Sequence, residues 1–457
     1  MNFEQCTELL NKFSQNHIAE HLRTLSGKEQ SELIGEISSV NFDKIEDLLK
    51  IAGSEDKTDK KIFPADCISI NNLSGKKDYM KICTDLGVDI IKKGKVAAFV
   101  VAGGQGSRLG FEGPKGAFPV SAVKNKTLFQ LHAEKVLSAS RKYGVKIPFL
   151  IMTSHANHAA TVDEFKKNSY FGLDSQNVHI FPQNMIPSLD TAGKLILSGR
   201  TSLFKNPDGH GGSLSALESS GVLDIIMSKG VEYISYFQVD NPLINIIDPL
   251  FFGVHGMEES ELSSKALIKA YPDEKVGIFV KYENSSIGVE EYSDLSKDIL
   301  FAEDSSGSLL YKWGSIGIHI FSCSFIKNNI SGGEINLPFH VARKKIKAYI
   351  NGEIKEIEGF KFEKFVFDSI PLAKKSIILE TLRENEFAPV KNASGIDSLE
   401  SSRELMNGLF RSWLAAKNYS IPDFVKNIEI SPLVALCGDD FPSGLSIDWK
   451  ENTYIGI

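Results

Sequence analysis

The chain has 457 residues, which is long for one hydrophobic core and enough for two or three folding units. Hydrophobic residues make up 42% of it and charged residues 24%, as in ordinary globular proteins, which argues against the disordered and fibrous classes. The formal net charge of −7 argues against a nucleic-acid or membrane-surface binder, because such proteins neutralise phosphates with a basic face.

The first 94 residues show helical periodicity. In "NFDKIEDLLKIAG" the apolar residues Phe42, Ile45, Leu48 and Leu49 recur at helical spacing, and Gly53 stands where a helix would end. We therefore expect a helical N-terminal unit, residues 1–94, that packs on the segment after it.

The pattern changes at Lys95 to short apolar runs that alternate with amphipathic stretches. "VAAFVVA" and "PFLIMT" have strand length, and "TLFQLHAEKVLSASRKYG" between them places Phe129, Ala133 and Val136 on one helical face. Strand, helix, strand in this order predicts a parallel sheet buried on both faces. Further strand candidates are "NVHIF", "EYISYFQVD", "KALIKA", "VGIFVKYE" and "LYKWGSIGIHIFS". The last three follow closely with little helix between them, so we expect a mostly parallel, mixed sheet in an α/β domain over 95–392.

A Ser-rich stretch, "NASGIDSLESS", follows Asn392 and indicates a boundary. The tail "NIEISPLVALCGDDF" predicts short strands. We expect residues 393–457 to form a small C-terminal unit.

The five cysteines, Cys6, Cys67, Cys83, Cys323 and Cys437, have no spacing typical of a zinc site, and an odd number cannot all pair. They indicate reduced thiols and a cytoplasmic protein. The N-terminus lacks the apolar run of a secretion signal, and no stretch of about 18 apolar residues predicts a membrane span.

A glycine loop, "AGGQGSRLG", follows the first predicted strand. In a parallel sheet it would bring backbone N–H groups to the carboxyl edge, where open α/β folds bind ligands. Gly103, Gly104 and Gly106 can take backbone angles closed to other residues and let a ligand approach the main chain. Such a run of amides binds phosphate oxygens; the alternative is a glycine-rich turn without a ligand.

The spacing of the loop excludes two common phosphate motifs. The Walker string, Gly, four residues and Gly-Lys-Ser/Thr, is absent. The dinucleotide fingerprint Gly-x-Gly-x-x-Gly opens a helix directly, whereas here the pattern from Gly104 is Gly-x-Gly-x-x-x-Gly, and Pro114 soon blocks a continuous helix.

Two cations flank the loop. Arg108 offers a planar fork for phosphate oxygens, and Lys115 supplies a mobile point charge. Together they could stabilise charge that develops when phosphorus is attacked, which favours chemistry over simple binding. Taken singly, each could equally be a solvated surface charge.

With these features the sequence resembles the UTP-dependent sugar-1-phosphate uridylyltransferases, and is most similar to the eukaryotic-type UDP-N-acetylhexosamine pyrophosphorylases. "GGQGSRLG" and "GPKG" match the family's loop at the same spacing. Seven more stretches follow in the family's order: "TLFQLHAEKV", "FPQNMIPSL", "NPDGHGGSLSAL", "FQVDNPLINIIDPLF", "VEEYSDLS", "FEKFVFD" and "RENEFAPVKNA". The matches cover residues 95–393 and imply a Rossmann-like nucleotidyltransferase domain.

The resemblance implies that the phosphate of a sugar 1-phosphate attacks the α-phosphorus of UTP and pyrophosphate leaves. It implies that Gly104 and its neighbours lie against the nucleotide, and that Gln183 and Gly209 contact the uracil. Arg108 and Lys115 would take the catalytic roles. UTP and a sugar 1-phosphate would be the binding partners.

Asp240 ends an apolar strand in "YFQVDNP", a position that suits a carboxylate holding Mg²⁺ against phosphates. The resemblance makes it the metal ligand and part of the sugar site; the alternative is a turn cap before Pro242. Lys391 resembles the family's late lysine that reaches the sugar phosphate. Phe365 and Phe367 alternate along an expected strand and would form either sugar wall or core.

Glu291 and Tyr292 match sugar-contacting positions of the family, and a glutamate can hold two neighbouring hydroxyls. Two positions depart from the N-acetylhexosamine enzymes. His210 stands where those enzymes have Asn and is similar to the "GHGD" stretch of UDP-glucose and UDP-sugar enzymes, and Ser315 replaces an Asn that faces the sugar. Losing two amides should weaken selection for an N-acetyl group, so the sequence leans to a glucose-type or relaxed specificity, with N-acetylglucosamine 1-phosphate as the alternative.

Two other functions stay open at this point. A dinucleotide-dependent oxidoreductase would share the glycine-rich strand exit, but the fingerprint spacing is missing. A non-catalytic nucleotide sensor of the same fold need not keep Arg108, Lys115 and Asp240, and all three are present.

Overall fold

The computed structural model describes residues 1–53, 61–70 and 77–456 of the chain. The chain divides into two compact units. The first unit combines three separate stretches, Met1–Asp59, Gln183–Ser213 and Leu337–Asp368. The second unit holds the remainder, Lys60–Pro182, Leu214–Asn336 and Ser369–Ile457.

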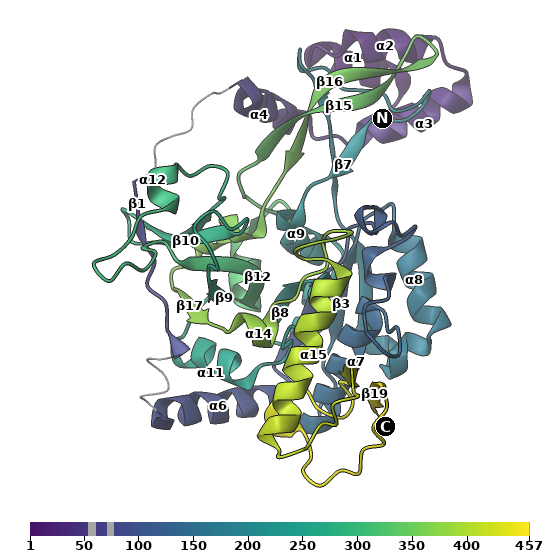
Figure 1. The fold of residues 1–457 in the computed structure, drawn as a ribbon. Helices are drawn as coiled ribbons and strands as arrows, with labels where there is room; N and C mark the ends of the chain where they lie inside the picture. Colours follow the sequence, from purple (N-terminus) through teal and green to yellow (C-terminus); the bar gives the residue numbers. More distant parts are fainter. Residues whose placement is uncertain (54–60, 71–76, 457) are drawn as a thin grey trace. The chain divides into compact units, whose positions relative to one another are not determined.

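The second unit is built on one sheet, in which ten strands of the described residues pair (Figure 1). They are β1 (Ile62–Pro64), β2 (Val96–Val101), β3 (Phe149–Thr153), β4 (Val178–Pro182), β8 (Tyr233–Gln238), β9 (Leu262–Ile268), β10 (Gly277–Tyr282), β11 (Ile287–Glu290), β12 (Trp313–Ser322) and β17 (Ser376–Glu380). The main order is β1-β10-β12-β8-β2-β3-β4; β11 pairs with β10, and β9 pairs with β12 and β17.

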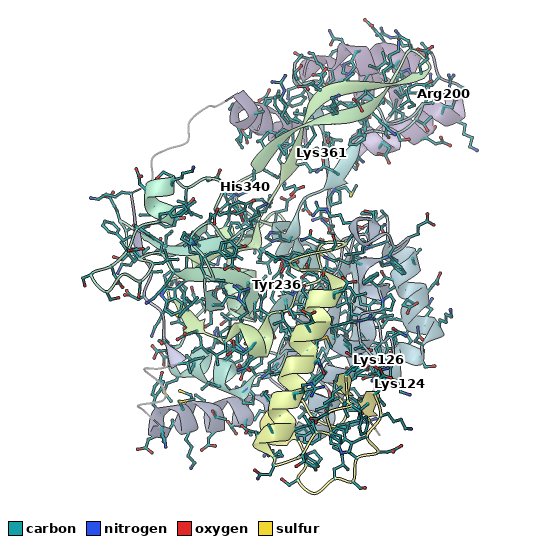
Figure 2. The ribbon with its side chains drawn as sticks, in the orientation of Figure 1. Lys124, Lys126, Arg200, Tyr236, His340 and Lys361 are labelled. Atoms are coloured by element: carbon teal, nitrogen blue, oxygen red, sulfur yellow. The ribbon has the colours of Figure 1, made fainter. Side chains whose placement is uncertain are left out.

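The sheet is mixed, as predicted. Its half around β2 is parallel, because β2 pairs in parallel with β3 and β8, and β3 with β4. The strands β2 and β3 are buried at every residue, which explains their continuous apolar runs. The later strand β12 is antiparallel to β8, β9 and β10. Tyr236 of β8 is fully buried in this sheet (Figure 2).

The helices of the second unit follow the expected alternation with strands. They are α6 (Lys77–Lys92), α7 (Leu128–Tyr143), α8 (His158–Lys167), α10 (Val222–Ser228), α11 (Pro249–Met257), α12 (Lys297–Leu300), α13 (Cys323–Asn329), α14 (Arg383–Glu386) and α15 (Leu399–Ala416), and α9 (Ser213–Ser219) starts at the unit boundary. Helix α7 lies where the periodicity places it, with Thr127 accepting a hydrogen bond from the Gln130 N–H at its start and Gly144 in the left-handed conformation at its end.

The first unit has its own hydrophobic core. It contains α1 (Phe3–Lys12), α2 (Asn16–Arg23), α3 (Gly27–Ser38), α4 (Phe42–Gly53), β5 (Met185–Pro187), β6 (Leu189–Asp190), β7 (Lys205–Pro207), β15 (His340–Ile350) and β16 (Glu353–Glu363). Leu10, Ile18 and Leu33 of the helices are fully buried in it together with Leu189 and Phe362 of the strands. The predicted N-terminal helices thus form, but their core is completed by segments far along the chain.

The two units differ from the predicted segments 1–94, 95–392 and 393–457. The short strand β1, which the helical periodicity did not predict, and helix α6 belong to the second unit. Glycines hold α6 against α11: a Cβ added at Gly87 would overlap the Pro249 carbonyl, and one added at Gly253 would overlap the Cys83 carbonyl. These units describe which residues pack compactly, not which segments fold independently. The division into residues 1–94, 95–392 and 393–457 therefore stays a prediction.

The C-terminal residues pack into the second unit. The strands β18 (Asn427–Ile430) and β19 (Asn452–Ile455) pair in parallel, and β13 (Ile330–Ser331) pairs with β14 (Glu334–Ile335). The buried ammonium of Lys126 lies 2.6 Å from a Glu134 carboxylate oxygen and donates a hydrogen bond to the Ser431 hydroxyl (Lys126 is labelled in Figure 2). All five cysteines are free thiols, and no helix among the described residues is long and apolar enough to cross a membrane.

Candidate active site

The glycine loop begins directly after β2 and closes on itself through main-chain hydrogen bonds. The Lys115 N–H donates to the Gly104 carbonyl at 3.0 Å, and the Gly106 N–H donates to the Gly113 carbonyl at 2.9 Å. The short 3-10 helices η1 (Ser107–Leu109) and η2 (Lys115–Ala117) follow, so no long helix starts here, as Pro114 predicted. The loop therefore differs in backbone from both excluded phosphate motifs.

The three predicted glycines of the loop have different surroundings. Gly104 is exposed, and a Cβ added to it would meet only the Lys115 Cδ, at 4.0 Å. A Cβ added to Gly106 would lie 2.7 Å from the Phe111 ring, so this glycine is required for packing within the loop. Gly103 is half-buried. Gly104 is thus the glycine that leaves the main chain open beside Lys115.

Lys115 and Asp240 meet at the carboxyl edge of the sheet. Asp240 follows β8, and β8 pairs in parallel with β2, which leads into the glycine loop. The Lys115 ammonium nitrogen lies 3.1 Å from an Asp240 carboxylate oxygen, and the two side chains are 16% and 15% exposed. A cation and an anion predicted from separate motifs therefore form one partly buried ion pair.

Lys391 belongs to the same charged group. Burial raises the pKa of the Asp240 carboxyl, but the charges of Lys115 and Lys391 outweigh burial and hold that pKa below its usual range. The main chain fixes this arrangement, because the Val390 N–H donates to the Asp240 carbonyl at 2.9 Å. Asp240 is consequently ionised at neutral pH between two lysines.

Arg108 lies on η1 and is exposed. Among the described residues it has no ion pair or hydrogen bond, so its guanidinium carries five unused donors. Of the two cations predicted for the loop, Lys115 is therefore paired, and Arg108 is unpaired among the described residues.

Asn157 is a residue of this site that the sequence did not single out. Its side-chain amide is 1% exposed and donates to the Ala102 carbonyl at 2.9 Å and to the Gly104 carbonyl at 3.1 Å. Its carbonyl oxygen accepts from the Ser154 N–H at 2.8 Å. Asn157 therefore ties the end of β3 to the glycine loop. In the structure Asn157 is the N-cap residue of α8, a position where asparagine is common, but the sequence analysis predicted no helix there.

Two of the predicted sugar residues come together at β10 of the second unit. Ser315 is the cross-strand partner of Gly277, and a Cβ added to Gly277 would lie 3.8 Å from a Glu291 carboxylate oxygen. The nearest atom to this Cβ would be the Val289 Cγ1, at 2.6 Å, so packing against Val289 requires the glycine. Tyr292 is half-buried beside Glu291. Ser315 and Glu291 thus both lie beside Gly277.

Gln183 and Gly209 lie together in the first unit. The buried Gln183 amide donates to the Gly209 carbonyl at 3.5 Å and to an Asp208 carboxylate oxygen at 3.4 Å. Gly209 has φ +81°, and a Cβ added to it would lie 2.5 Å from the Lys364 carbonyl oxygen. Both the backbone angle and this close approach require glycine.

His210, Phe365 and Phe367 form an aromatic stack in the same unit. The rings of His210 and Phe365 are stacked at 5.2 Å and 13°, and those of Phe365 and Phe367 lie 5.1 Å apart. The His210 Nδ1 accepts a hydrogen bond from the Val366 N–H at 3.1 Å. Burial, with a smaller contribution from the nearby His340, lowers the pKa of His210 to about 4.

The expected strand through Phe365 and Phe367 is wrong. The strand β16 ends at Glu363, and Phe367 lies in the 3-10 helix η6 (Val366–Leu372). The two rings still meet, because the chain turns and does not continue extended. Two aromatics at alternate positions do not show by themselves whether the chain through them is extended or turned.

Comparisons with known proteins show the family to which the chain belongs. A family model described as UTP–glucose-1-phosphate uridylyltransferase matches residues 46–443. UDP-N-acetylglucosamine diphosphorylase 2 of Arabidopsis thaliana is 34% identical over 455 residues, which is 95% of this chain and 90% of the relative. UDP-N-acetylglucosamine pyrophosphorylase of Saccharomyces cerevisiae is 32% identical over 457 residues, 95% of each chain. The crystal structure of the uridine diphosphate N-acetylglucosamine pyrophosphorylase from Trypanosoma brucei with an inhibitor matches with a TM-score of 0.80 at 28% identity, over 96% of this chain and 94% of that chain.

The parallel sheet and its glycine loop, together with these matches, define a nucleotidyltransferase. The chain belongs to the UTP–glucose-1-phosphate uridylyltransferase family. It is an enzyme of the UTP:sugar-1-phosphate uridylyltransferase class, as the motifs predicted. Family membership favours this activity over the oxidoreductase and the non-catalytic sensor that the sequence left open.

Proposed function

We propose that the chain forms UDP-N-acetylglucosamine and pyrophosphate from UTP and N-acetylglucosamine 1-phosphate. The sugar phosphate oxygen bonds to the α-phosphorus of UTP, and the bond from this phosphorus to the oxygen bridging it to the β-phosphorus breaks. The relatives that match this chain nearly end to end carry N-acetylglucosamine in their names, which supports the choice of sugar.

The charged group at the sheet edge carries the proposed chemistry. The Lys115 ammonium separates from Asp240, binds the phosphates and stabilises the charge that develops as pyrophosphate departs. Arg108 binds the triphosphate through its unused donors. Lys391 neutralises the sugar phosphate beside Asp240. Gly104 lets the main-chain N–H groups approach the nucleotide. The pair of Lys115 and Asp240 is the observation on which this assignment rests.

Asp240 fits a divalent cation, and we propose Mg²⁺. Its carboxylate has a lowered pKa and stands at the end of a strand, beside the residues proposed to bind phosphate. No group of three or more His, Cys, Asp or Glu among the described residues could hold a metal ion. Mg²⁺ suits such a site because it commonly takes one carboxylate and fills its other positions with phosphate oxygens and water. When bound, it would neutralise phosphate charge.

The surroundings of His210 favour N-acetylglucosamine over the glucose-type preference that the sequence suggested. Its ring is stacked on Phe365 and its Nδ1 accepts from the Val366 N–H, so these contacts account for the histidine without a sugar. An asparagine oxygen could accept from the same N–H. We therefore assign His210 to packing against the segment of Phe365 and Val366.

Glucose 1-phosphate remains a second candidate because of Ser315. The serine is the cross-strand partner of Gly277 and offers a hydroxyl but no amide to hold an N-acetyl group. Gln183 and Gly209 would hold the uracil, and Glu291, Tyr292, Phe365 and Phe367 the sugar.

The test is a panel of sugar 1-phosphates with UTP, assayed as kcat/KM. We expect N-acetylglucosamine 1-phosphate to exceed glucose 1-phosphate, His210→Asn to leave this ratio within about twofold, and Ser315→Asn to raise it. Turnover of glucose 1-phosphate alone would contradict the proposed sugar. A ratio that follows His210→Asn and ignores Ser315→Asn would contradict the assignment of these two residues.

A further inference from the structure

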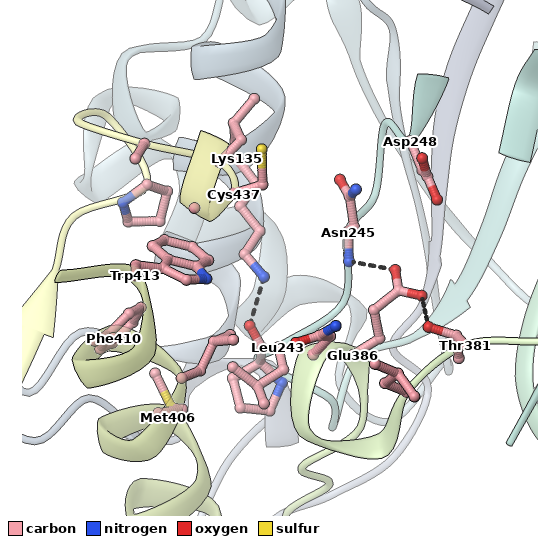
Figure 3. Close-up of a pocket in the computed structure, with 18 of the residues that line it drawn as sticks. Lys135, Leu243, Asn245, Asp248, Thr381, Glu386, Met406, Phe410, Trp413 and Cys437 are labelled. Atoms are coloured by element: carbon pink, nitrogen blue, oxygen red, sulfur yellow. Dashed lines mark hydrogen bonds between the residues drawn. The ribbon is translucent and has the colours of Figure 1, made fainter. Parts of the chain in front are cut away.

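A cavity of about 370 Å³ lies in the second unit, within the range of small-molecule sites. Side chains from α7, α14, α15 and the loop after β8 line it, as Figure 3 shows. Lys115, Asp240 and the glycine loop are not among its lining residues. The cavity is therefore separate from the site described above.

The ionisable residues of the cavity give it a negative balance. Two lysines and four carboxylates line it, which leaves a formal charge of −2: Lys135, Lys265, Asp248, Glu380, Glu386 and Glu429. Lys265 lies 2.6 Å from both the Asp248 and the Glu386 carboxylates, so it already serves as their common counter-ion. A cation is thus favoured over an anion in the remaining space.

Lys135 contributes little positive charge to the cavity. Its ammonium donates to the backbone carbonyls of Pro242 and Ile244, at 2.5 and 2.7 Å. Burial lowers the pKa of Lys135 to about 7, although Glu386 nearby raises it. The amine can therefore lose its proton near neutral pH, and then a carboxylate of the cavity has one less cation to face.

Glu429 has a buried carboxylate oxygen that lacks a hydrogen bond. Its Oε2 accepts from the Val123 and Lys124 N–H groups, both at 2.8 Å. Its Oε1 is buried and has no hydrogen-bond partner among the described residues, and the residue is 2% exposed. An unsatisfied buried acceptor is costly, so a ligand that brings an N–H donor gains from this oxygen.

Aromatic and sulfur-containing side chains of α15 form one side of the lining. Phe410 and Trp413 of α15 meet edge to face with ring centroids 5.5 Å apart, and Met406 lies one turn earlier. Figure 3 shows these three side chains on one side of the cavity, across from Asn245 and Glu386. Aromatic faces attract ammonium groups and the carbon body of an amine, and methionine adapts to varied shapes.

We propose that this cavity binds an apolar amine, with its ammonium group at Glu429 and its hydrocarbon or aromatic body against Met406, Phe410 and Trp413. The ligand class follows from the negative balance, the acceptor without a donor and the aromatic wall. Binding forms and breaks no covalent bond.

The cavity also has a direct connection to the charged group of the catalytic site. Leu243 and Asn245 of its lining belong to the loop that starts at Asp240. In that loop the Asn241 side chain donates to the Glu386 carbonyl at 2.6 Å and accepts from the Ala388 N–H at 3.1 Å, so the loop and the segment leading to Lys391 are tied together. A bound amine would therefore change turnover. This effect on turnover rests on the proposed function, but the binding of the amine does not.

Isothermal titration calorimetry on the full chain without UTP tests the binding. The probes are 2-phenylethylamine and tryptamine, with 3-phenylpropionate as an anion of matched size. We expect saturable heat from the amines and none from the carboxylate. Equal binding of the carboxylate, or no binding of either amine, would overturn the proposal.

Two variants locate the ligand. Glu429→Gln should weaken amine binding about tenfold or more, because a hydrogen bond to a charged group is lost, and Glu404→Gln on the exposed side of α15 should leave it unchanged. If Glu429→Gln fails to fold, Leu409→Trp, which fills the cavity from the same helix, should abolish binding. Undiminished binding in the folded variant would refute the site. Unchanged kcat and KM at saturating amine would refute the connection to catalysis and leave the proposed transferase activity intact.

Discussion

Asn157→Asp is the substitution that tests most sharply how the glycine loop is held. Aspartate has the same shape as asparagine and keeps the acceptor for the Ser154 N–H, but it loses both N–H donors to the Ala102 and Gly104 carbonyls. Each lost hydrogen bond is worth roughly 0.5–1.5 kcal/mol, so the two account for about 1–3 kcal/mol of stability. A carboxylate placed against two carbonyl oxygens in a site that is 1% exposed moves the effect toward the upper value.

The substitution should also reduce turnover. Gly104 lies beside Lys115, and a displacement of about 1 Å at a reacting centre can cost about 100-fold in rate. We expect kcat to fall about 10- to 100-fold and the thermal midpoint to decrease, as measured by pyrophosphate release and differential scanning fluorimetry. The control is Asn168→Asp, at the exposed C-terminal end of the same helix, where the side chain also donates to a carbonyl. A loss no larger in Asn157→Asp than in Asn168→Asp would refute this reasoning.

Three more predictions follow from the site. Lys115→Ala should lower kcat far more than it weakens UTP binding by calorimetry, and an equal loss in both would mean that the lysine acts alike on ground state and transition state. Gly209→Ala should destabilise the first unit by several kcal/mol, because the new Cβ would lie 2.5 Å from a carbonyl oxygen at φ +81°, whereas Gly27→Ala, with open space around it, should not. The pKa of Asp240 is lowered below its unfolded value of 3.8, so the charge stabilises the fold above about pH 4 and this stability is lost as pH falls through the folded pKa. The stability difference between the wild type and Asp240→Asn should therefore stay constant from pH 5 to 8 and shrink below pH 4, and a change near pH 6 would contradict the lowered pKa.

Local patterns predicted the second unit well because its central strands are buried on both faces. A strand such as β2, buried at all six residues, must be an apolar run whatever its neighbours are. Because β2 and β8 pair in parallel, Lys115 and Asp240 lie at the same edge of the sheet. Their proximity could therefore be predicted, but their separation of 3.1 Å could not.

The first unit could not be predicted in the same way. Its core joins helices of residues 1–53 with strands near residues 189 and 362, and hydrophobic periodicity shows that a face is buried but not which segment covers it. The same holds for Asn157 and Glu429, whose roles come from contacts with distant main-chain groups. A single polar side chain carries no sequence pattern from which such partners could be read.

The most direct test of the central claim follows the α-phosphorus of UTP. With UTP labelled at this phosphorus, Mg²⁺ and N-acetylglucosamine 1-phosphate, we predict that the label passes into a UDP-sugar and that unlabelled pyrophosphate forms in equal amount, in the wild type but scarcely in Lys115→Ala. Pyrophosphate release without the sugar phosphate, or full transfer by Lys115→Ala, would contradict the assignment of the charged group at the sheet edge.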